Sequence, residues 1–72
     1  MLSDQIMMNS VVIDEVAVHQ RPDIIEYLGS KAIEELRRKL PIGATVIASR
    51  IVMTACPDRL AREMRIEVRF HL

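Results

Sequence analysis

Residues 63–72 read EMRIEVRFHL and alternate charged or polar side chains with apolar ones without a break. The apolar members are Met64, Ile66, Val68, Phe70 and Leu72. Because successive side chains of a strand point to opposite faces, this period of two predicts a strand with one apolar and one charged face. We expect the first face to lie on a core and the second to meet water.

A second strand is predicted directly before this one, at residues 44–55 (ATVIASRIVMTA). Residues 56–59 between them include Pro57 and Asp58, which are common turn residues. The two strands should therefore form an antiparallel hairpin.

A helix is predicted over residues 23–40. Its apolar residues recur every three or four positions, which gives one stripe: Ile25, Leu28, Ala32, Ile33, Leu36 and Leu40. Asp23 and Glu26 have the spacing of a capping box, and Pro41 ends the helix. Gly29 in its interior indicates a close approach to the sheet or a kink.

The β-branched stretch 11–18 (VVIDEVAV) reads as the first strand, with Val12, Val16 and Val18 on one face. Residues 1–10 are an N-terminal arm or a lead-in to this strand. Met7 and Met8 would either fill the core or contact a partner.

These elements predict one α+β domain over residues 11–72 with a β-α-β-β order. A right-handed crossover through the helix would set the first two strands parallel. The expected architecture is a three-stranded mixed sheet with one helix on one face.

The length of 72 residues is close to the lower end of what folds alone, and half of the residues are hydrophobic. Small domains usually need a disulfide, a metal or an interface for support. Cys56 is the single cysteine, and His19 and His71 have no metal-ligand spacing near them. We therefore predict association, with no metal or cofactor.

Localisation is expected to be cytoplasmic, without a membrane partner. The first ten residues lack the pattern of a secretory signal, and no apolar run reaches 18 residues.

Charge is divided unevenly along the chain. Residues 1–36 carry two basic and seven acidic groups, a net of −5, whereas residues 37–72 carry eight basic and three acidic groups, a net of +5. Opposite charge in the two halves permits self-association. The candidate contacts for a phosphate or another anionic ligand are Arg50, Arg65, Arg69 and His71. The alternative is a solvated strand face on which Glu63 and Glu67 pair with the arginines.

Nucleic-acid binding through the arginine face is a further alternative, but it is not favoured. Stacking on bases needs exposed aromatic side chains, and the chain has only Tyr27 and Phe70. Only one helix is predicted, so a helix-turn-helix is not expected. An enzyme is not expected either, because no nucleophile lies beside His19 or His71 by local spacing.

The β-α-β-β order, the length and the alternating last strand resemble dodecins, small flavin-binding proteins that assemble into hollow spheres. This resemblance spans residues 11–72 and implies a homo-oligomer that binds a flavin, a nucleotide or another small anionic ligand between subunits. The tryptophan that stacks on flavin in that family is absent here.

The sequence thus favours a small non-enzymatic structural or interaction module that associates with itself or with a partner protein. A virus or phage assembly or accessory protein would suit this size. The interface is expected at the apolar strand residues Val12, Val16, Val18, Met64, Ile66, Val68 and Phe70.

Overall fold

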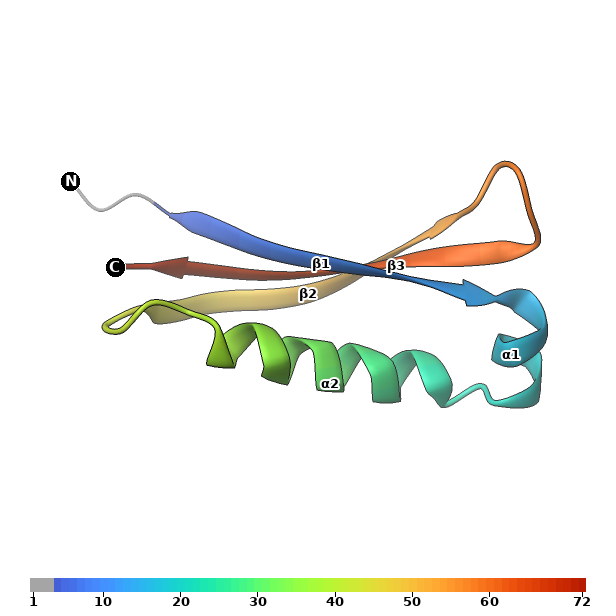
Figure 1. The fold of residues 1–72 in the computed structure, drawn as a ribbon, viewed down its shortest axis with the longest axis horizontal. Coiled ribbons are helices and arrows are strands. Elements are labelled where there is room, and N and C mark those ends of the chain that lie inside the picture. Colours follow the sequence, from blue (N-terminus) through green and yellow to red (C-terminus); the bar gives the residue numbers. More distant parts are fainter. Residues whose placement is uncertain (1–3) are drawn as a thin grey trace.

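A computed structural model describes residues 4–72, which form a three-stranded sheet with two helices (Figure 1). The elements in chain order are β1 (Gln5–Asp14), α1 (Glu15–Gln20), α2 (Ile24–Arg38), β2 (Thr45–Ala55) and β3 (Ala61–His71). Both helices lie on the same side of the sheet (Figure 1). The α+β class predicted from the sequence is confirmed.

The sheet order is β1-β3-β2, and both pairs of neighbours are antiparallel. The predicted mixed sheet is therefore wrong. β1 and β2 do run in the same direction, but β3 lies between them because it folds back beside β2 and then pairs along its other side with β1. β3 is thus the central strand, and β1 and β2 are the two edges.

The first strand differs most from its prediction. β1 includes residues 5–10 and ends at Asp14, while residues 15–20, which contain Val16 and Val18, form α1. The ladder ends there because Asp14 is opposite Ala61, the first residue of β3, and residues 57–60 form the turn. A strand continued to Val18 would have had no partner for its backbone groups. Residues 5–10 of the predicted lead-in therefore belong to the sheet, and residues 1–3 lie outside the described part.

The helix predicted at residues 23–40 is confirmed as α2, but its expected capping box is absent. Asp23 has helical dihedral angles, and its side chain makes no capping hydrogen bond. A residue that caps through its side chain normally has an extended backbone. Helix α2 therefore begins without a capping hydrogen bond from the Asp23 side chain.

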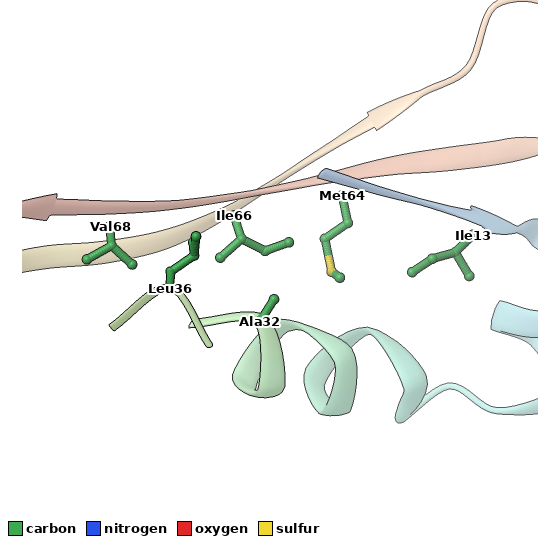
Figure 2. Packing of buried hydrophobic residues seen from close by; sticks show 6 residues of the cluster. All are labelled: Ile13, Ala32, Leu36, Met64, Ile66 and Val68. Carbon is green, nitrogen blue, oxygen red and sulfur yellow. The ribbon is translucent and has the colours of Figure 1, made fainter. Parts of the chain in front are cut away.

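The core lies between α2 and the sheet face that carries the even-numbered residues of β3. Met64, Ile66 and Val68 are completely buried, and they point toward Ala32 and Leu36 of the helix (Figure 2). Ile13 of β1 adds to this cluster. The predicted alternation is confirmed on this face as far as Phe70, which is buried as well, but not for Leu72, which follows the end of β3 and is 51% exposed.

Gly29 marks a close approach of α2 to the sheet, one of the two alternatives that the sequence left open. It is buried, and a Cβ atom placed on it would overlap the side chain of Ile51 on β2. A larger residue at this position would require the end of the Ile51 side chain to move. The glycine therefore leaves room for Ile51 between α2 and β2.

Candidate functional site: the uncovered face of the sheet

The face of the sheet opposite the helices has no element over it among residues 4–72 (Figure 1). Directly opposite residues of antiparallel strands point to the same face, so the strand registers define its members. We call this surface the outer face. It consists of Ile6, Met8, Ser10, Val12 and Asp14 of β1, Ala61, Glu63, Arg65, Glu67, Arg69 and His71 of β3, and Thr45, Ala48, Arg50, Val52 and Thr54 of β2.

Glu67 lies at the centre of the outer face and is buried, with 8% of its surface exposed. Its Oε1 accepts a hydrogen bond from Arg50 Nε at 2.5 Å, and Arg65 Nε is 3.6 Å from its Oε2. Two arginines therefore pair with one carboxylate, as the ion-pair alternative expects for Arg50 and Arg65. Contact of these arginines with a ligand stays a prediction.

Arg69 of the outer face is exposed, and within residues 4–72 it makes no salt bridge. It lies opposite Ile6 on one side and Ala48 on the other. These residues line a hollow of about 180 Å³ together with Ser49, Arg50 and Glu67. The hollow thus combines guanidinium groups with an apolar wall.

The structure brings the predicted ligand contacts onto one surface but not into one site. Arg50 and Arg69 line the hollow, while Arg65 reaches Glu67 without lining it. His71 lies at the end of β3, opposite Thr45. A small anion in the hollow would therefore meet Arg69 first, because Arg50 is held by Glu67.

The predicted interface residues divide between the core and the surface. Met64, Ile66, Val68 and Phe70 are buried inside the chain itself. Val12 is exposed on the outer face, while Val16 is exposed and Val18 half-buried on α1.

Ile6, one of the most exposed apolar side chains of the outer face, was not predicted from the sequence. Ile6 and Met8 are each 57% exposed and lie in a row with Val12 along β1. Met7 points the other way and packs against the core. The pattern is present in the sequence, since Ile6, Met8 and Val12 are all even-numbered, but it predicts a shared face only if residues 1–10 form a lead-in to the strand and not an arm, and the sequence left these two alternatives open.

A second ion pair joins the acidic and basic halves of the chain. Arg62 Nε donates to Glu15 Oε1 at 2.6 Å, and the Glu15 backbone N–H donates to the carbonyl of Leu60 at 3.1 Å. These contacts hold the start of α1 against the start of β3. They close one end of the sheet and leave the outer face itself open.

The protein is thin and elongated, with principal extents of 45 × 22 × 15 Å. Its accessible surface is 5274 Å², whereas a compact monomer of its mass would expose about 4,500 Å². Its radius of gyration is 14.0 Å, compared with about 11 Å for a compact domain of this length. The chain therefore exposes roughly 700 Å² more than a compact fold would, close to one partner's share of a standard interface.

Residues 4–72 contain no cluster of three or more histidine, cysteine, aspartate or glutamate side chains that could hold a metal ion. Within the same range, no helix is long and apolar enough to cross a membrane.

Comparisons with known proteins give no relative. No family model matches the chain, and neither a curated protein nor a solved structure is significantly similar to it.

Proposed function

We propose that this chain is a small structural or interaction module that acts as an assembly of copies of itself. The observation that carries the proposal is the exposed area. A single layer of helices covers one face of the sheet, and the other face leaves Ile6, Met8 and Val12 in water. An exposed apolar row of this kind is typical of an interaction surface.

A second copy is favoured over an unrelated partner by the charges on the outer face. One end of this face carries Asp14 and Glu63, and the other end carries Arg69. A second copy that ran in the opposite direction would bring unlike charges together at both ends. Complementary charges of this kind set orientation more than they add affinity.

The experiment that tests this proposal is thermal unfolding over about a hundredfold range of protein concentration, because association stabilises the folded state by mass action. We expect Tm to rise with concentration. A Tm that does not change with concentration would mean that the fold needs no second copy, and it would contradict the proposal.

Binding of a small anion is a second candidate, favoured by the position of Arg69 in the hollow. An anionic group could accept hydrogen bonds from its guanidinium while an apolar part lies on Ile6 and Ala48. A calorimetric titration with inorganic phosphate and with a flavin mononucleotide tests this candidate. Binding should be lost in Arg69→Gln and retained in Arg37→Gln, which removes an exposed arginine from α2. No binding by the unaltered protein would exclude it.

A further inference from the structure

The two edges of the sheet are protected very differently. β2 has a register shift between Val46 and Ala48, so Ile47 bulges out of the ladder, and Arg50 lies in the middle of the strand. Bulges and basic side chains are the usual devices that keep an edge strand from pairing with another chain. The free edge of β2 therefore carries two such devices.

β1 has none of these features. It pairs with β3 over ten residues without a register shift. Its sequence, QIMMNSVVID, contains no lysine, arginine, proline or glycine, and its one charged residue is Asp14 at the end. Within residues 4–72 nothing pairs with the other side of β1. A long, regular and apolar edge of this kind is a template for strand addition.

We infer that the free edge of β1 pairs antiparallel with β1 of a second copy, so that one continuous sheet runs through both copies. This inference deepens the proposed self-association and rests on it. Pairing would satisfy the outward-facing backbone N–H and C=O groups of both strands, and it would place the exposed Val12 opposite an apolar residue of the partner.

The sequence of β1 is suited to pairing with itself. Residues 6–8 and residues 11–13 are apolar trios, and they flank the polar pair Asn9-Ser10 at the centre. When two antiparallel strands are related by a two-fold axis, the axis passes between one residue and the same residue of the other copy. With Asn9 on the axis, Ile6 is opposite Val12. With Ser10 on the axis, Met8 is opposite Val12.

Pairing through β1 would also limit the assembly to two copies. An isologous contact uses the same surface of both partners, so the unprotected edge of each copy is covered at once. The edges left at the two ends of the joined sheet are the β2 strands with their bulges. Pairing of β1 with β2 of the next copy would instead leave an open β1 edge and continue into a fibre.

Disulfide cross-linking tests this inference directly, because Cys56 is the only cysteine of the chain and can be removed by Cys56→Ser. In that background, Asn9→Cys and Ser10→Cys place single thiols at the centre of β1. Directly opposed residues of antiparallel strands have Cα atoms about 4.5–5.5 Å apart, which is within the span of a disulfide between copies. Ser49→Cys and Thr54→Cys on β2 are matched controls, since both replace exposed polar residues of the other edge strand.

We expect mild oxidation to convert most of the Asn9→Cys or the Ser10→Cys protein to a covalent dimer and to leave both β2 variants monomeric on a denaturing gel. A short bismaleimide reagent should give the same ranking. Cross-linking that is as strong through β2 as through β1 would overturn the inference. An oligomer of the expected mass that does not cross-link through β1 would also overturn it and would leave the proposed self-association standing. A monomer at every concentration would instead contradict the self-association itself.

Discussion

The two faces of β3 come from one alternating sequence, but they are stabilised in different ways. On the helix side, Met64, Ile66 and Val68 have no exposed surface and pack against α2. On the outer face, Arg65 and Arg69 are exposed, and the buried Glu67 pairs with Arg50 and Arg65. The covered face is held by apolar packing and the open face by ion pairs.

This difference indicates which face of the sheet has its packing partner within the same chain. The core face has its partner layer within the same chain, so changes there should affect folding. The outer face has an apolar row on β1 and paired charges on β3, but no covering layer among residues 4–72. Changes there should affect association more than folding. The predictions below test this distinction.

The largest effect is expected from Ile66→Ala. Removing a completely buried isoleucine leaves a cavity under α2 and should lower the free energy of unfolding by about 2–5 kcal/mol. Denaturation in urea measures this loss. The matched control is Arg69→Ala on the outer face of the same strand, which should change stability by about 0.5 kcal/mol or less. Equal losses in the two variants would remove the contrast between the faces.

A smaller effect is expected from Glu67→Gln. The substitution keeps the shape of the side chain but removes the charge that Arg50 and Arg65 share, so it should cost about 1–2 kcal/mol. Glu34→Gln is the control, because Glu34 makes an exposed pair with Arg38 on α2 that contributes about 0.5 kcal/mol or less. Urea denaturation of both variants should rank Glu67 first. The reverse ranking would show that the pairs around Glu67 do not stabilise the fold.

Met8→Lys should act on association and not on folding. Met8 is exposed on the outer face at the edge strand, so a lysine would place an unpaired charge in the contact and weaken it at least tenfold, about 1.4 kcal/mol. Sedimentation measures the dissociation constant. Tyr27→Lys is the control, because Tyr27 is 54% exposed, similar to Met8, but lies on α2 and not on the sheet. Unchanged association of Met8→Lys would exclude β1 and the neighbouring outer face from the contact.

The smallest effect is expected from Asp23→Ala. An N-cap side chain that bonds the helix backbone usually contributes about 1 kcal/mol. Asp23 makes no such bond and has only an exposed contact with Arg21 at 3.4 Å. The substitution should therefore change the free energy of unfolding by less than about 0.5 kcal/mol. A loss of a full kcal/mol would show that the side chain caps α2 in solution.

The parts of the fold that depend on local patterns were predictable from the sequence. The alternation of residues 63–72 places Met64, Ile66 and Val68 in the core, and the stripe that contains Ala32 and Leu36 places α2 over them. These patterns report which side of an element is buried. They need no knowledge of the neighbouring element.

The parts that depend on pairing between distant residues were not predictable. Where β1 ends is set by Ala61, because β3 begins there and offers no partner further along. The place of β3 between β1 and β2 is likewise a property of the whole sheet. The pairing of the buried Glu67 with Arg50 could not be predicted from the alternation, because Arg50 is on a different strand.

The most direct test of the central claim is the mass of the unaltered protein in solution, measured by light scattering after size exclusion. An absorbance scan of the same peak shows whether a chromophore or nucleotide is bound. We predict a defined oligomer, because the sheet of a single copy leaves one face and the β1 edge uncovered. A monomer at all concentrations would contradict the claim that a second copy completes this fold.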